Sequence, residues 1–235
     1  IREYKKVQSL EEAWELNQKR ANRVIGGMMW MRLGDSNFQT AIDLSGLGLD
    51  TIEETEDEFR IGCMVTLRQL ETHPGFVSYT QNMCKESLRH IVGVQFRNLA
   101  TVGGSIYGRY GFSDVLTLLI GLDSYVELYK GGMIPLREFA KGKSDNDILV
   151  QIIIKKHPVE MYYEAVRITQ TDLPVLTCCG VHDKENGSYT ISIGARPGRA
   201  VIVPDDKLLL KGKLTTEAIE AYARYAAEVV PTDSN

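Results

Sequence analysis

The sequence predicts an α+β protein built from two parts that meet near residues 145–155. Three observations support this fold class. Helical and strand-like stretches follow one another in the first part of the chain. A polar loop at residues 141–147 then interrupts the pattern. Beyond the loop, several strand-like runs lie close together, which is typical of a small antiparallel sheet, and a final helix follows them.

Ser9 begins the first predicted helix, because a serine followed by Glu11 and Glu12 forms a typical N-terminal cap. Its apolar stripe continues to about residue 19. The next elements are expected to be strands at 23–25 and 41–44, a hairpin of 51–54 with 58–62, a short helix at 67–70 capped by Thr66, and a longer helix at 79–89.

Later elements follow from the same signals. An apolar helix is expected at 115–120, a strand at 124–129, a turn at Gly131-Gly132, and a short helix at 137–139. The C-terminal sheet is expected to contain the runs 148–154, 162–167, 174–181 and 188–193, with a hairpin at Glu185-Asn186-Gly187. Residues 195–200 are expected to form a loop, and Thr215 or Thr216 caps the last helix.

Composition excludes several classes of function. The 235 residues carry a net charge of −4 and no basic cluster, so no nucleic-acid partner is expected. No apolar run reaches the roughly 18 residues needed to cross a membrane, and the first residues lack the apolar segment of a signal peptide. We therefore expect a cytoplasmic protein with no membrane partner.

Cysteine and histidine usage predicts no metal site on this chain. The four cysteines show no C-x-x-C spacing and are expected to be reduced, buried thiols, so an iron–sulfur cluster would belong to another chain. The four histidines are scattered and show no ligand spacing. No residue is predicted to be catalytic.

Two Gly-Gly pairs, each expected in a turn after a strand, are the main functional signal. Gly26-Gly27 and Gly103-Gly104 lie about 77 residues apart, and Gly108 follows the second pair. Without a Cβ, glycine lets backbone N–H groups approach a phosphate closely. One such pair is usually only a turn, but two together predict a diphosphate held between two loops. Their spacing does not fit the G-x-G-x-x-G unit of a Rossmann domain.

The segment Met28-Met29-Trp30-Met31 has two interpretations. It is bulky and apolar, which favours core filling. Alternatively, it forms a wall for a flat aromatic ligand.

Five motifs together resemble the FAD-binding subunit of the molybdenum hydroxylase family, which includes the xanthine dehydrogenase flavin domain and the carbon monoxide dehydrogenase medium subunit. They are residues 9–13, Ile25-Gly26-Gly27, the run 97–105 with Ser113-Asp114, residues 163–167 with Thr171-Asp172, and residues 211–215. The resemblance implies a two-lobed FAD-binding domain of the p-cresol methylhydroxylase type. That domain is expected at residues 1–150, with lobes of about 1–55 and 56–150, followed by a C-terminal domain at 151–235.

The resemblance also implies the cofactor site. Backbone N–H groups of the two loops would hold the pyrophosphate of FAD, with the second loop the stronger of the two. Asp114 would accept hydrogen bonds from cofactor hydroxyls or would cap the helix that follows it. The implied cofactor-binding residues are Ile25, Gly26, Gly27, Met28, Met29, Trp30, Thr101, Val102, Gly103, Gly104, Ser105, Gly108 and Asp114.

The function implied by the resemblance is electron transfer. Iron–sulfur clusters on a [2Fe-2S] small subunit would pass electrons to FAD, and FAD would pass them to NAD(P)+ or another acceptor. Substrate oxidation would take place on a molybdenum-cofactor large subunit. Two alternatives remain open. Met28, Met29 and Ala165 depart from the family's usual residues and favour a flavin-free assembly subunit, and a stand-alone flavin reductase of the same fold is the other.

Overall fold

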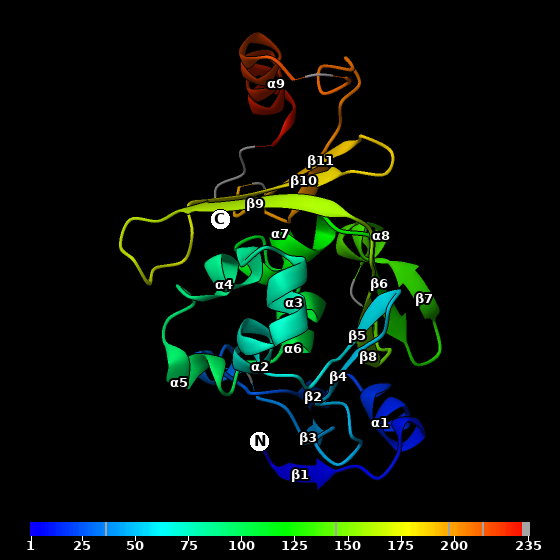
Figure 1. The fold of residues 1–235 in the computed structure, drawn as a ribbon. Coiled ribbons are helices and arrows are strands. Elements are labelled where there is room, and N and C mark those ends of the chain that lie inside the picture. The colour runs from blue at the N-terminus through cyan, green and yellow to red at the C-terminus, as the bar shows by residue number, and fades with distance from the viewer. Residues whose placement is uncertain (36, 144, 197, 213, 232–235) are drawn as a thin grey trace.

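The computed structural model describes residues 1–235 except 36, 144, 197, 213 and 232–235. The described chain contains a three-stranded, a five-stranded and a four-stranded sheet with helices around them (Figure 1). The small N-terminal sheet lies at one end, a helical layer and the five-stranded sheet form the middle, and the four-stranded sheet with the last helix lies at the other end. This arrangement confirms the predicted α+β class.

The N-terminal sheet is parallel, with strand order β1-β3-β2. Its elements are β1 (Glu3–Lys6), α1 (Leu10–Asn17), β2 (Arg23–Ile25) and β3 (Thr40–Asp43), and a short 3-10 helix, η1 (Met31–Leu33), follows β2. Central β3 is buried along its whole length, as parallel strands usually are. The exposed edge strand β1 was not predicted, because its charged sequence has no strand signal.

The middle sheet is antiparallel, with strand order β4-β5-β8-β6-β7. Its strands are β4 (Ile52–Glu54), β5 (Glu58–Gly62), β6 (Ser124–Leu128), β7 (Gly132–Pro135) and β8 (Leu149–Lys155). The run 148–154 was expected in the C-terminal sheet, and this prediction is wrong: β8 pairs with β5 and β6. Its isoleucines at 152–154 are at most 2% exposed, so the strand needs cover on both faces, which a central position provides.

The middle part of the described chain contains seven helices: α2 (Leu67–Thr72), α3 (Pro74–Tyr79), α4 (Met83–Leu88), α5 (Val94–Arg97), α6 (Val102–Tyr107), α7 (Asp114–Ile120) and α8 (Leu136–Lys141). The single helix expected at 79–89 is instead split between α3 and α4. Gln81 and Asn82 have φ values of 50° and 68°, which end the helical path. The Gln81 side chain compensates by bonding the backbone at Val159 and Met161.

The C-terminal sheet is antiparallel, with strand order β12-β11-β10-β9. Its strands are β9 (Val159–Val166), β10 (Leu176–Asp183), β11 (Tyr189–Gly194) and β12 (Val201–Val203), and helix α9 (Thr216–Val229) follows. The sheet packs on α4 and α7, and α9 covers it through a small apolar cluster. Thr215 caps α9 by accepting from the N–H of Ala218, as predicted. Lys213 of the 211–215 motif lies outside the described residues.

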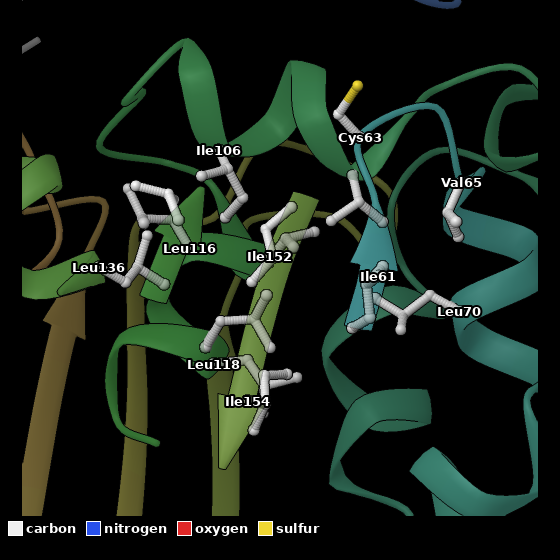
Figure 2. Packing of buried hydrophobic residues seen from close by; sticks show 14 of the residues in the cluster. Ile61, Cys63, Val65, Leu70, Ile106, Leu116, Leu118, Leu136, Ile152 and Ile154 are labelled. Carbon is white, nitrogen blue, oxygen red and sulfur yellow. The ribbon is translucent and has the colours of Figure 1, made fainter. Parts of the chain in front are cut away.

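One continuous apolar core joins the middle sheet to the helices (Figure 2). Ile61 of β5 and Ile152 of β8 pack with Ile106 of α6 and Leu116 of α7. Because α6 carries Gly103 and Gly104, this core fixes the second glycine segment against β5. All four cysteines are free thiols, and three of them are buried. No helix in the described ranges is both long and apolar enough to cross a lipid bilayer.

Candidate functional site

A cavity of about 1010 Å³ opens beside both glycine segments. Its wall contains all of the predicted binding residues except Val102, which is completely buried in the core. Other segments contribute to the wall, among them the turn around His90, residues 145–149, and the loop that follows β9. Residues from the N-terminal sheet, from the middle layer and from loops of the C-terminal part therefore meet at one cavity.

Close backbone contact brings the two glycine segments together. A Cβ at Gly27 would lie 1.7 Å from the carbonyl oxygen of Leu99, and a Cβ at Gly26 would lie 2.5 Å from Oγ1 of Thr101. Neither contact leaves room for a side chain. The glycines after β2 are therefore needed for the first loop to lie against the second.

The second segment is not a turn after a strand, which corrects the sequence-based expectation. It follows α5, and Thr101 caps α6 with its hydroxyl. The N–H groups of residues 102–105 already have acceptors, which are the carbonyl oxygens of Val65, Cys63 and Thr101 and the hydroxyl of Thr101. These donors hold α6 against the end of β5 and are not free for a phosphate.

Free donors lie on the first loop instead. The N–H groups of residues 27–30 have no acceptor among the described residues. Met28 has a φ of 56°, so the chain turns through the left-handed region at this point. Consecutive unpaired N–H groups in such a turn form a concave site that attracts anions. The loop carrying Met28 and Met29 thus has the backbone chemistry that phosphate binding needs.

Gly104 differs from the other glycines of the motif. The protein atom that a Cβ at 104 would meet is Oγ1 of Thr101, at 3.2 Å, whereas a Cβ at Gly103 would collide with Cys63. Gly104 also lies on the cavity wall. Its missing side chain leaves space that a ligand can use, so the residues present fit a cofactor with a diphosphate.

An aromatic cluster forms another part of the wall. The ring centroid of Trp30 lies 5.8 Å from that of Tyr110 and 5.0 Å from that of Phe112, and the last two rings stack at 5.2 Å. Trp30 is 41% exposed, so it is not core filling. The structure favours the interpretation as a wall for a flat ring. Tyr110 and Phe112 were not among the residues expected at the site, although both lie next to glycines in residues 108–112.

Asp114 is the most buried carboxyl group of the cavity wall. Ser113, not Asp114, caps α7, so the predicted capping role is wrong. The Asp114 carboxylate accepts hydrogen bonds from the hydroxyl of Tyr163 at 2.7 Å and from the guanidinium of Arg167. Burial raises the pKa of Asp114, and the nearby Arg167 charge opposes that shift.

Two other titratable groups of the wall offer no acid–base chemistry. Burial raises the pKa of the Cys63 thiol to about 12, so it stays protonated near neutral pH. Burial and the charges of Arg89 and Arg167 lower the pKa of His90. Among the described residues, no group of three or more histidine, cysteine or acidic side chains could hold a metal ion.

Comparison with known proteins places this chain in a family. The model of the FAD-binding domain in molybdopterin dehydrogenases matches residues 2–156, more than half of the chain. The chain therefore belongs to this family of FAD-binding domains.

Two relatives match over almost the whole chain. An uncharacterized protein of Escherichia coli K12, YgfM, is 24% identical over 251 residues, which cover 99% of this chain and 95% of YgfM. The nicotine 6-hydroxylase medium subunit of Paenarthrobacter nicotinovorans is also 24% identical, over 96% of this chain and 86% of that protein.

Solved structures share the fold. A chain of carbon monoxide dehydrogenase from Hydrogenophaga pseudoflava, in a form that lacks the Mo-pyranopterin moiety, matches with a TM-score of 0.90 at 22% identity, covering 100% of this chain and 88% of that chain. A chain of quinoline 2-oxidoreductase from Pseudomonas putida 86 matches with a TM-score of 0.87 at 19% identity over the same shares of the two chains. These matches confirm the fold expected from the resemblance.

Proposed function

We propose that this chain is the FAD-carrying electron-transfer subunit of a molybdenum-containing hydroxylase or dehydrogenase. It works with a molybdenum-cofactor large subunit and a [2Fe-2S] small subunit. Electrons enter from the iron–sulfur clusters of the partner and leave to NAD(P)+ or another acceptor, as in xanthine dehydrogenase. One relative is itself named a medium subunit of a hydroxylase, which supports this role.

The observation that carries the proposal is the cavity between the two glycine segments. The unpaired N–H groups of residues 27–30 hold the pyrophosphate, Gly104 leaves room for it, and the rings of Trp30 and Phe112 contact a flat part of the cofactor. A bound flavin supplies redox chemistry that side chains lack. The chain itself binds and orients the cofactor. The first two sheets form the FAD-binding domain, and β9 to β12 with α9 form the C-terminal domain.

Reconstitution with FAD tests the proposal. The full chain should acquire the visible absorption bands of oxidised flavin and retain them through gel filtration. Gly104→Leu should remove this flavin, because the new side chain enters the cavity. Gly180→Leu is the matched control, because a Cβ at Gly180 meets only Ile191 Cδ1, at 3.4 Å, and Gly180 does not line the cavity.

A flavin-free assembly subunit is the second candidate. Met28 and Met29 place thioether side chains on the cavity wall, and both depart from the residues that the family usually has after its first Gly-Gly. Under this alternative, the wild-type chain stays colourless with excess FAD, and Gly104→Leu still assembles with the large and small subunits. Co-purification from the native cell identifies those subunits and the electron acceptor in either case.

A further inference from the structure

Arg109 and Arg199 are two cations of the cavity wall that have no carboxylate partner. Arg109 follows α6 and Arg199 precedes β12, so they come from distant segments of the chain. Among the described residues, neither guanidinium forms an ion pair, whereas another buried arginine of the wall, Arg167, pairs with Asp114. Buried charges in proteins are normally paired, so these two cations indicate that a negative charge comes from outside the chain.

Arg109 is held firmly and has one nitrogen left over. It is only 5% exposed, its Nε donates to the carbonyl oxygen of Phe139 at 2.8 Å, and its Nη1 donates to that of Tyr107 at 3.1 Å. The guanidinium carbon also lies 3.7 Å from the centroid of the Phe139 ring. Nη2 has no acceptor among the described residues, yet it keeps accessible surface, because the one buried side-chain nitrogen or oxygen without a partner in that part of the chain is Nε of Arg167. A planar guanidinium clamped in this way presents its remaining N–H groups in a fixed direction.

Both arginines are anchored at the C-terminal end of α8. Arg109 binds the carbonyl oxygen of Phe139, and Nη1 of Arg199 donates to the carbonyl oxygens of residues 140–142 at distances from 2.9 to 3.3 Å. The last carbonyl groups of a helix lack partners within the helix and attract cations. This end of α8 therefore brings two guanidinium groups from different loops to one part of the cavity wall.

The charges around Arg109 do not cancel. Burial lowers its pKa, and the charge of Arg199 lowers it further, against the opposing effects of Tyr107 and Asp145. The Asp145 carboxylate is engaged elsewhere: it accepts from the Tyr107 hydroxyl at 3.3 Å and from the backbone N–H of Asp147 at 3.1 Å. Two neighbouring cations repel each other, so an anion that contacts both of them relieves this repulsion.

Building on the proposed function, which gives the cavity a ligand with phosphate groups, we propose that Arg109 and Arg199 form an anion site for a phosphate group of a nucleotide. This site is separate from the unpaired N–H groups of residues 27–30, which belong to the loop after β2. Arginine suits phosphate because its N–H groups match the spacing of the phosphate oxygens. The phosphate belongs either to FAD or to a second nucleotide such as NAD+, and the experiment separates these two sources.

FAD binding to the full apo chain tests the first source. Arg109→Gln should raise the dissociation constant of FAD at least about tenfold, because a charged contact to phosphate is lost. Arg199→Gln should raise it less, because Arg199 is exposed. Added salt should weaken FAD binding to wild type more steeply than to Arg109→Gln, because the variant lacks an ionic contact. A purely structural role of Arg109 would leave this salt dependence unchanged.

Arg224→Gln is the matched control. Arg224 lies on α9 and does not line the cavity, and its replacement changes the net charge by the same amount. Because distant exposed charges are screened, its dissociation constant for FAD should stay within about twofold of wild type.

NAD+ binding tests the second source, by calorimetry on the chain after saturation with FAD. If the phosphate belongs to a second nucleotide, Arg109→Gln should leave the affinity for FAD unchanged and raise the dissociation constant of NAD+ at least about tenfold. Either result supports the anion site, and the nucleotide that loses affinity identifies the source of the phosphate.

Three results would overturn the inference: unchanged affinity for both nucleotides in Arg109→Gln, an equal loss in Arg224→Gln, or a loss in Arg109→Gln that keeps the salt dependence of wild type. If Arg109→Gln does not fold, the exposed position gives the decision, and unchanged affinity of Arg199→Gln for both nucleotides rejects the site. A wild-type chain that binds no FAD rejects the proposed function itself. NAD+ binding then decides on the anion site alone, and a chain that binds neither nucleotide has no such site.

Discussion

Gly27 and Leu99 lie so close together that a Cβ on residue 27 would stand 1.7 Å from the carbonyl oxygen of residue 99. This contact joins the first cavity loop to the segment that leads into α6. Gly27→Ala should therefore force the two loops apart, lower the free energy of unfolding by about 3 kcal/mol and weaken FAD binding. Urea unfolding measures the loss. Gly34→Ala is the control, because a Cβ at Gly34 meets only a carbonyl oxygen at 3.9 Å; equal stability of the two variants would contradict the prediction.

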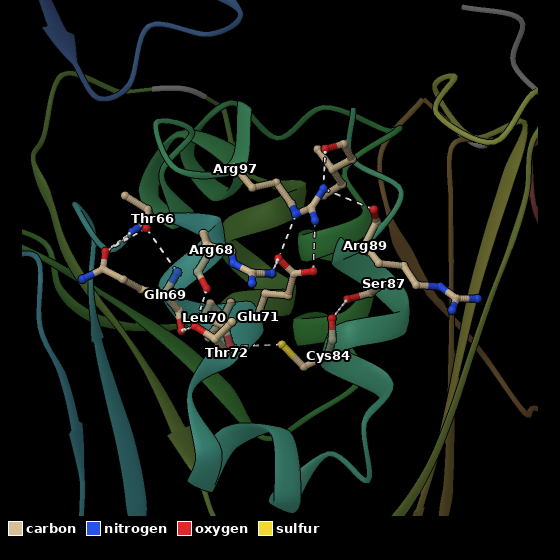
Figure 3. Close-up of polar contacts among 11 residues, drawn as sticks. Thr66, Arg68, Gln69, Leu70, Glu71, Thr72, Cys84, Ser87, Arg89 and Arg97 are labelled. Atoms are coloured by element: carbon tan, nitrogen blue, oxygen red, sulfur yellow. Dashed lines mark hydrogen bonds and ion pairs between the residues drawn. The ribbon is translucent and has the colours of Figure 1, made fainter. Parts of the chain in front are cut away.

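Arg97 of α5 and Glu71 of α2 form a buried ion pair (Figure 3). Both side chains are at most 5% exposed, and two nitrogens of Arg97 bond the two carboxylate oxygens at 2.9 and 3.1 Å. Arg97→Met should cost about 3–5 kcal/mol of stability, because it leaves Glu71 buried without this partner. The exposed pair of Arg89 with Glu86 is the control, and Arg89→Met should cost less than about 1 kcal/mol.

The same pair predicts a pH dependence. Burial acts to raise the pKa of Glu71, but hydrogen bonds from Arg97 and Arg68 outweigh it and hold the pKa below its ordinary value. The pair therefore contributes its stability above the unfolded pKa of about 4.3, and that contribution is lost as the pH falls through the lower folded value. Acid titration followed by circular dichroism should show a shallower pH dependence for Glu71→Gln than for wild type.

Thr117 of α7 and Thr177 of β10 share a buried hydrogen bond of 2.9 Å between their hydroxyls. Both side chains are completely buried where the C-terminal sheet packs on α7. Thr117→Val should cost about 1–2 kcal/mol, because the Thr177 hydroxyl loses its partner. The double variant Thr117→Val/Thr177→Val should recover part of this loss. Additive losses in a double-mutant cycle would show that the two hydroxyls are not coupled.

His157 should make stability depend on pH near neutrality. Burial lowers its pKa, but hydrogen bonds to Asp123 and Glu185, at 3.3 and 3.5 Å, outweigh burial and raise it. The charged His157 therefore contributes to the free energy of unfolding. This contribution is complete below the unfolded pKa of about 6.5 and is lost as the pH rises through the higher folded pKa. Wild type should thus melt higher at about pH 6 than at about pH 8, and His157→Gln should reduce the difference. An unchanged difference would assign the effect to other groups.

The sequence predicts most local elements correctly because their signals are local. Ser9, Thr66 and Thr215 cap helices as expected, and Glu185-Asn186-Gly187 forms the expected hairpin. The placement of β8 depends on pairing with β5, about 90 residues earlier in the chain, and no local pattern reveals that partner. The domain boundary predicted at residue 150 falls inside this strand.

The candidate site shows the same limit. Both glycine segments line the cavity, but the sequence does not reveal which of them has free donors. The acceptors for residues 102 and 103 are the carbonyl oxygens of Val65 and Cys63, about 40 residues away. Likewise, Asp114 and Arg167 each belong to a recognised motif, and only the fold brings them into contact. Tertiary hydrogen bonding therefore decides which part of a motif remains available to a ligand.

The central position of β8 also constrains the order in which this protein can assemble during synthesis. Strands β5 and β6 each bond β8 rather than one another, so the hairpins β4-β5 and β6-β7 cannot join into one sheet until residues 149–155 have left the ribosome. The helices α2 to α8 are synthesised before that point, and the apolar surface that packs against β8 stays exposed to solvent until β8 is made. A nascent chain arrested before residue 149 should bind chaperones and resist protease poorly, and one extended well past residue 155 should not.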